Sequence, residues 1–179
     1  ATKMWSDLFL ADGGVINWDN GALTLTSEDS NTLTMAGGSI VLPQRKFTKT
    51  TNTDGTHEGD VVFFGGEAET IAAGQLVHYN SSGNWQLADA DDNTKSDGLL
   101  GVALGADASV NGILLRGMVT LDHDPGAVGD VLYVSTTAGD TTATAPSSSG
   151  NIVRVIGYCL DASNGQIWFN PDGTFVEVA

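Results

Sequence analysis

The chain has few basic residues and a single cysteine. Its 179 residues hold 7 Lys+Arg against 22 Asp+Glu, which gives a formal net charge of -15. Coulomb repulsion from such a surface opposes association with a phosphate backbone, so nucleic acid is not an expected partner. One cysteine cannot form an intramolecular disulfide, so packing must hold the fold together.

Signals for membrane spans and for helices are also scarce. No apolar stretch is long enough to cross a bilayer and no charged-then-apolar leader is visible, so neither membrane insertion nor a signal peptide is expected. Only 16% of the residues are charged, whereas 23 residues are glycine. With abundant Thr, Val and Leu, this composition indicates an all-β chain with many turns.

Very short strand cues fill residues 5–42, which read WSDLFLADGGVINWDNGALTLTSEDSNTLTMAGGSIVL. The cues alternate with Gly-Gly, Asp-Asn-Gly and Asp-Ser-Asn turn signals. Strands this short bury too little apolar surface alone, so they must stack on copies of themselves, along one chain or between chains. We expect strands at residues 8–10, 15–16, 23–25, 33–35 and 40–42.

This run resembles the shaft segment that recurs in bacteriophage tail-fibre proteins. The resemblance is carried by Trp-Ser-Asp-Leu-Phe-Leu at residues 5–10 and by Asn-Thr-Leu-Thr-Met-Ala-Gly-Gly at residues 31–38. It implies a β-solenoid or β-prism-like shaft within an intertwined homotrimer in a virion. It also implies that the apolar residues of the shaft pack between chains, namely Trp5, Leu8, Leu10, Ile16, Trp18, Leu25, Leu33 and Met35.

Three regions are predicted: a shaft-like segment at 1–43, a polar Thr-rich linker at 44–59 and a head at 60–179. The head contains an internal duplication, with copies at about 60–123 and 124–179. Glycines recur at an offset of about 55 residues. The matched pairs are Gly74 with Gly129, Gly83 with Gly139, and Gly101 with Gly157.

Each copy predicts a hairpin, a variable loop, a buried strand and a second hairpin. Residues 76–79 and 131–134 are the first strands, and the apolar runs 99–104 and 155–160 are typical of strands covered on both sides. Asn-Gly pairs at 111–112 and 164–165 indicate two-residue hairpin turns. Two small barrels or sandwiches, or one pseudo-symmetric barrel, would result.

The head resembles the small β-barrel of phage head-decoration proteins and of fibre tip domains. In this sequence the pattern is carried by Gly74, Gly83, Leu100-Gly101-Val102-Ala103-Leu104 and Leu115-Arg116-Gly117. The resemblance implies a structural protein on a phage particle. It leaves open whether that particle's tail or its head carries the chain.

Catalytic and metal-binding motifs are not found in the sequence, so we expect neither an enzyme nor a cofactor. A depolymerase would need paired carboxylates on a long solenoid, for which the chain is short. His57 and His123 each lie beside acidic residues and could hold a metal, but a solvated loop histidine is the favoured interpretation. Residues 89–93 begin like a calcium loop yet lack its sixth-position Gly and twelfth-position Glu, so no metal is predicted.

Aromatic side chains in the head are either core residues or a surface for stacking sugars, and core is favoured. The candidate receptor contacts are Tyr79, Trp85, Asp89 and Trp168. Cys159 lies in an apolar run and is expected to be a buried small hydrophobic residue.

The predicted function is that of the distal part of a phage tail fibre that acts in attachment to the host surface. Specificity would come from the loops at 88–98 and 141–150, which differ most between the copies. Expected partners are further copies of the chain, other virion proteins, and a bacterial surface glycan or protein. The alternative is a capsid decoration or head-fibre protein that stabilises the phage head.

Overall fold

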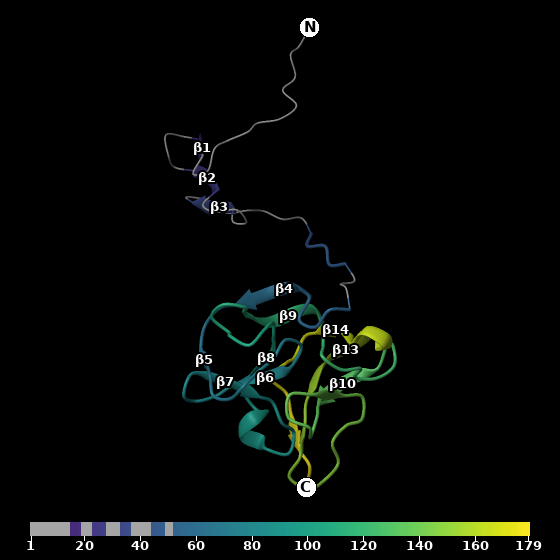
Figure 1. The fold of residues 1–179 in the computed structure, drawn as a ribbon. Helices are drawn as coiled ribbons and strands as arrows, with labels where there is room; N and C mark the ends of the chain where they lie inside the picture. Colours follow the sequence, from purple (N-terminus) through teal and green to yellow (C-terminus); the bar gives the residue numbers. More distant parts are fainter. Residues whose placement is uncertain (1–14, 19–22, 28–32, 37–43, 49–51) are drawn as a thin grey trace. The chain divides into compact units, whose positions relative to one another are not determined.

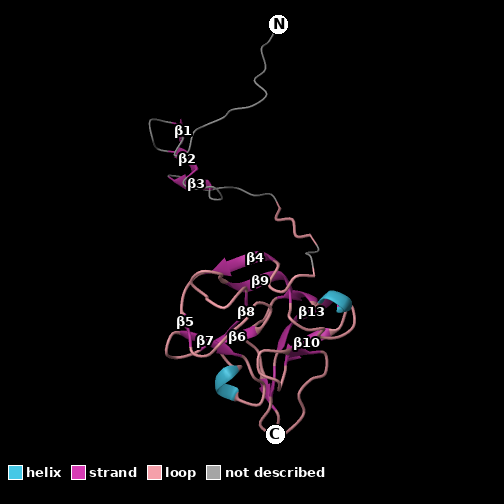
Figure 2. Ribbon diagram, viewed as in Figure 1, coloured by secondary structure: helices cyan, strands magenta, loops and turns pink. Residues whose placement is uncertain are grey.

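The computed structural model describes residues 15–18, 23–27, 33–36, 44–48 and 52–179. The chain divides into one unit of residues 1–46 and a second of residues 47–179 (Figure 1). In the part of the chain that the structure describes, nearly all regular structure is β, with two short 3-10 turns, so the predicted all-β class is confirmed (Figure 2). Within the described ranges, no helix has the length and apolar character needed to span a membrane.

The first unit contains an antiparallel three-stranded sheet of β1 (Val15–Trp18), β2 (Leu23–Ser27) and β3 (Leu33–Ala36). These strands confirm the cues at 15–16, 23–25 and 33–35. Ile16 lies opposite Leu25, and Leu25 lies opposite Met35. The register thus aligns Ile16, Leu25 and Met35 across the three strands, whereas Val15 and Ala36 lie at the alternate positions, opposite Thr26 and Thr24. Trp5, Leu8, Leu10 and the cues at 8–10 and 40–42 fall outside the described residues.

The second unit is built on one ten-stranded sheet with the order β11-β10-β13-β14-β9-β8-β6-β7-β5, in which β4 also pairs with β9. The sheet ends at β11 and β5 and is therefore open. A separate two-stranded sheet joins β12 (Ile152–Val153) and β15 (Val176–Glu177). The strands of the large sheet are β4 (His57–Val62), β5 (Gly66–Glu67), β6 (Leu76–Tyr79), β7 (Asn84–Leu87), β8 (Leu99–Ala103), β9 (Ile113–Thr120), β10 (Val131–Val134), β11 (Thr141–Thr142), β13 (Val155–Asp161) and β14 (Gln166–Phe169).

The interval expected as a linker is partly incorporated into the head. Strand β4 begins at His57, so residues 57–59 pair with β9. The backbone N and the hydroxyl of Thr48 each donate to the carboxylate of Glu58 at 2.6 Å. Phe47 meets Trp168 edge-on, with ring centroids 5.5 Å apart. The head therefore begins near Phe47 rather than at residue 60.

The two aligned segments of the head have the same strand order. Copy one reads β7-β6-β8-β9 and copy two reads β11-β10-β13-β14, and the copies join where β9 pairs with β14. Equivalent backbone bonds recur: the amide of Gly74 donates to Ala103 O at 2.8 Å, and that of Gly129 donates to Cys159 O at 2.9 Å. The duplicated sequence thus forms one continuous sheet rather than two separate barrels.

Two matched glycine pairs explain why the copies share this geometry. Gly83 and Gly139 have φ values of +79° and +86°, as their hairpin turns require. Gly101 and Gly157 instead allow close approach of the next strand. A Cβ at 157 would collide with the backbone oxygen of Trp168, and one at 101 would collide with the Ile113 side chain.

The Asn-Gly pairs do not form the predicted two-residue hairpins. The β8–β9 connection runs from residue 104 to residue 112, and β13 reaches β14 through the 3-10 turn η3 (Ala162–Asn164) and Gly165. Asp107 Oδ1 accepts the amides of Ser109 and Val110, and Asp161 Oδ1 accepts that of Ser163. These side-chain bonds compete with a tight turn and make both connections longer.

The main core is shared by both copies, while a second, smaller core belongs to copy one. The shared core includes Leu76, Leu100 and Val102 from copy one, and Leu132, Ile156 and Phe169 from copy two. The smaller core contains Ile71, Val77, Trp85, Ala103, Ala108 and Ile113. Both faces of the copy-one sheet are therefore buried.

Only one face of copy two is buried in this way. Leu132 and Val134 point into the shared core, whereas Val155 and Tyr158 are 37% and 48% exposed. The prediction that 155–160 is covered on both sides was wrong, although residues 100–103 of copy one do fulfil it. Tyr158 lies opposite Val131 and Trp168, so these residues share the open face.

Candidate functional site

Copy one carries a polar hollow of about 460 Å³ between strand β6, the following turn and the loop before β8. We call it the first hollow. The β6–β7 hairpin contributes residues 78–82 and Gln86 to its lining, and residues 94–98 contribute the rest. The loop predicted to confer specificity therefore lines this hollow. The lining residues are His78, Tyr79, Asn80, Ser81, Ser82, Gln86, Thr94, Asp97 and Gly98.

The hairpin wall of the first hollow is fixed by Asn80. Its Oδ1 accepts the amides of Ser82 at 3.0 Å and Asn84 at 3.1 Å. Its Nδ2 donates to Gln86 Oε1 at 3.2 Å. An Asn that bonds the amide two residues on is a standard turn device, and here it also ties the turn to the returning strand.

The opposite wall is held by Arg154, which comes from copy two. Arg154 is 4% exposed, and its Nη1 donates to Ser96 O at 2.8 Å and to Gly98 O at 2.6 Å. Its Nε and Nη2 donate to Asp172 O at 3.1 and 2.7 Å. One buried guanidinium thus fastens the loop of copy one to the C-terminal segment.

His78 forms the inner end of the first hollow. Its Nε2 accepts the amide of Gly98 at 3.2 Å and lies 3.4 Å from Asp97 Oδ1. Burial lowers the pKa of His78; the charge of Asp97 opposes this shift and that of Arg154 adds to it. This lowered pKa favours the neutral ring at pH 7, and Nδ1 is buried with no hydrogen-bond partner among the described residues.

A second hollow of about 280 Å³ occupies the corresponding place in copy two. Ser135 takes the position of Asn80: its hydroxyl accepts the amide of Thr137 at 3.0 Å, as Asn80 accepts that of Ser82. The lining is rich in hydroxyl groups and consists of Ser135, Thr136, Thr142, Thr144, Ala145, Pro146, Ser147, Ser148 and Asn151. The duplication has therefore produced two hollows with different side chains.

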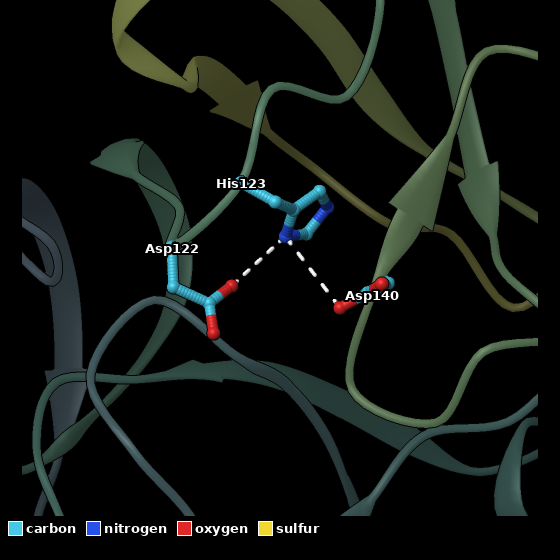
Figure 3. A group of neighbouring side chains, drawn as sticks. All are labelled: Asp122, His123 and Asp140. Carbon is cyan, nitrogen blue, oxygen red and sulfur yellow. Dashed lines mark hydrogen bonds and ion pairs between the residues drawn. The ribbon is translucent and has the colours of Figure 1, made fainter.

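Asp122, His123 and Asp140 form the only group in the described part of the chain that is spaced to hold a metal ion. Nδ1 of His123 lies 2.8 Å from Asp122 Oδ1 and 3.7 Å from Asp140 Oδ1 (Figure 3). Nε2 accepts the amide of Thr141 at 3.0 Å. Burial lowers the pKa of His123, but the bond to Asp122 and the charge of Asp140 outweigh it, so this pKa lies above its ordinary value.

The same hydrogen bonds give this group a structural role without a metal ion. A metal on Nδ1 would displace the proton shared with Asp122, and a neutral ring would then carry its proton on Nε2. That proton would face both the amide of Thr141, which is a donor, and Thr141 Oγ1 at 3.2 Å, which can accept it. The adjoining hollow, lined by Asp54, Asp122 and Asp124 among others, measures about 240 Å³.

The four candidate receptor contacts do not form one site. Trp85 is fully buried and its Nε1 donates to Phe64 O at 2.8 Å, so it is a core residue and cannot contact a ligand directly. Tyr79 packs on Trp85, with ring centroids 4.8 Å apart, and lines the first hollow. Asp89 accepts the amide of Asp91 within the loop, and Trp168 lies on the open face of copy two.

Sequence reasoning missed the role of Arg154 and the hydrogen bond from the Gly98 amide to His78 on β6. A cation inside the apolar run of residues 152–156 is the one local signal that could have drawn attention to Arg154. Cys159 is 1% exposed, as expected, and burial raises the pKa of its thiol.

No protein-family model, curated protein or solved structure matches the chain.

Proposed function

We propose that the chain is the distal part of a phage tail fibre that assembles as a homotrimer and attaches the virion to a host surface. In this proposal, residues 1–46 gather the chains and residues 47–179 form the recognition unit. Binding and reach, rather than catalysis, are its tasks.

The observation that carries the proposal is the register of the three-stranded sheet. Ile16, Leu25 and Met35 are aligned across it, while the alternate register positions hold Thr24, Thr26 and Thr34 together with Val15 and Ala36. A small sheet with one apolar face is not stable alone and needs a covering partner. A second copy of the same sheet is a partner with matching chemistry.

Mass measurement of the full chain at micromolar concentration tests the assembly. We expect a trimer, and a monomer would contradict the proposal. Leu25→Asp places a charge on the apolar face and should dissociate the trimer. Thr24→Asp places the same charge on the opposite face and serves as the matched control.

A capsid decoration protein is the second candidate, and the open face of copy two favours it. Tyr158 and Val155 are exposed there, and Tyr158 pairs with Trp168. An exposed apolar sheet face suits contact with another protein. Antibody–gold labelling of intact particles separates the candidates. Labels at tail tips support the fibre, and labels on heads support decoration.

A further inference from the structure

The first hollow is the only one of the three hollows described above with the size of a ligand site. Pockets that bind small ligands measure about 300–1,000 Å³. The first hollow, at about 460 Å³, falls within this range, whereas the second hollow and the hollow beside Asp122 do not.

Its lining selects the chemical class of the ligand. The hydroxyl groups of Ser81 and Ser82 can donate and accept hydrogen bonds. Nε2 of Gln86 can donate, and the hydroxyl of Thr94, which donates to Asp92 Oδ1, can still accept. The one carboxylate is that of Asp97, and His78 is neutral at pH 7. An anionic ligand would be repelled by Asp97 and by the net charge of -15, so a neutral molecule with many hydroxyl groups fits best.

Both walls are in place before a ligand arrives. Asn80 bonds the turn to Gln86, and Arg154 bonds the backbone of the opposite loop at Ser96 and Gly98. Preorganised walls reduce the conformational entropy that binding would otherwise cost. The tip of the loop remains accessible, because the side chain of Asp97 is 50% exposed.

We infer that the first hollow binds a neutral sugar residue of a surface glycan, an inference that rests on the proposed role in host attachment. Asp97 accepts a hydrogen bond from a sugar hydroxyl, and the amide and hydroxyl groups of the hairpin wall bind its neighbours. Tyr79 supplies the aromatic part of the wall. The second hollow, with its hydroxyl lining and smaller volume, does not share this specificity.

Titration of the isotope-labelled full chain with glucose, galactose and N-acetylglucosamine, followed by NMR, tests the inference. We expect one of these sugars to shift the amide signals of residues 80–82 and Gly98. Asp97→Asn should weaken that binding about tenfold, since a charged acceptor is replaced by a neutral one. Asp91→Asn makes the same charge change outside the lining and should leave the affinity unchanged.

Three outcomes would overturn the inference. They are no shift at these amides with any of the three sugars at about 100 mM, equal affinity of Asp97→Asn and the wild type, or binding of N-acetylneuraminic acid alone. Attachment of the full chain to host cells is measured separately. If Asp97→Asn still attaches to host cells, the first hollow is not the attachment site, but the proposed function stands. If the sugar binds and the chain does not attach, the proposed function is refuted and the sugar site stands.

Discussion

The two copies of the head share a backbone plan but differ in what covers them. Copy one buries both faces of its sheet, because Ile71 and Trp85 pack in a second core on the side away from copy two. Copy two buries one face and leaves Tyr158 and Val155 exposed. The comparison shows that glycine positions and strand register determine the backbone geometry that the copies share. The side chains, and the segments outside the matched strands, determine what each copy can contact.

The largest expected effect comes from the matched glycines at the buried strands. Gly157→Ala should lower the free energy of unfolding by about 3 kcal/mol or more, because the new Cβ meets the backbone oxygen of Trp168. Gly101→Ala should cost about 1–3 kcal/mol, because the Ile113 methyl group that it meets first can move. Urea denaturation measures both. Gly173→Ala, with open space around it, is the control, and equal losses at 101 and 157 would contradict this account.

Removal of the guanidinium that links the copies should have the next largest effect. Arg154→Met leaves the carbonyl oxygens of Ser96, Gly98 and Asp172 without their donor, so we expect a loss of about 2–3 kcal/mol. Hydrogen exchange at Gly98 should also accelerate. Arg116→Met removes an exposed arginine and should change stability by less than about 0.5 kcal/mol. Unchanged exchange at Gly98 in Arg154→Met would refute the role assigned to Arg154.

His78 and His123 should give stability opposite dependences on pH. The pKa of His78 is lowered by burial, so its contribution is complete above the ordinary value of 6.5 and is lost as the pH falls through the folded-state pKa. The pKa of His123 is raised, so its contribution is complete below 6.5 and is lost as the pH rises through its folded-state pKa.

Unfolding of single variants between about pH 5 and pH 8 separates the two histidines. His78→Gln should reduce the loss of stability on acidification, and His123→Gln should reduce the loss on the alkaline side. If either variant keeps the pH slope of the wild type, the environment assigned to that histidine is wrong.

The smallest effect is expected at the two side chains that immediately precede the first strand of each copy. Gln75 Oε1 accepts the amide of Ala72 at 2.9 Å, and Asp130 Oδ2 accepts that of Ala127 at 2.9 Å. Gln75→Ala and Asp130→Ala should each lower the midpoint of urea unfolding by an amount that corresponds to about 0.5–1.5 kcal/mol. Losses that differ by more than about 1 kcal/mol would show that the two positions are not equivalent.

Local features of the chain were predictable, and contacts distant in sequence were not. Alternating apolar residues and turn glycines located β1–β3, β6 and β10, and the recurrent glycines aligned the copies. The pairing of β9 with β14 has no signature in the local sequence pattern. The core that the two copies share and the open face of copy two were therefore not predicted. The walls of the first hollow likewise come from segments at 78–86 and 94–98 that only the fold brings together.

Native-state hydrogen exchange of the full chain is the most direct test that the two copies form one cooperative sheet. The matched amides are those of Gly74 and Gly129, and of Ala103 and Cys159, all of which donate to backbone oxygens. Because the core is shared, we predict that all four open with the free energy of global unfolding of residues 47–179. Opening of Gly129 and Cys159 at a clearly lower free energy than Gly74 and Ala103 would contradict the account, because the copies would then unfold independently.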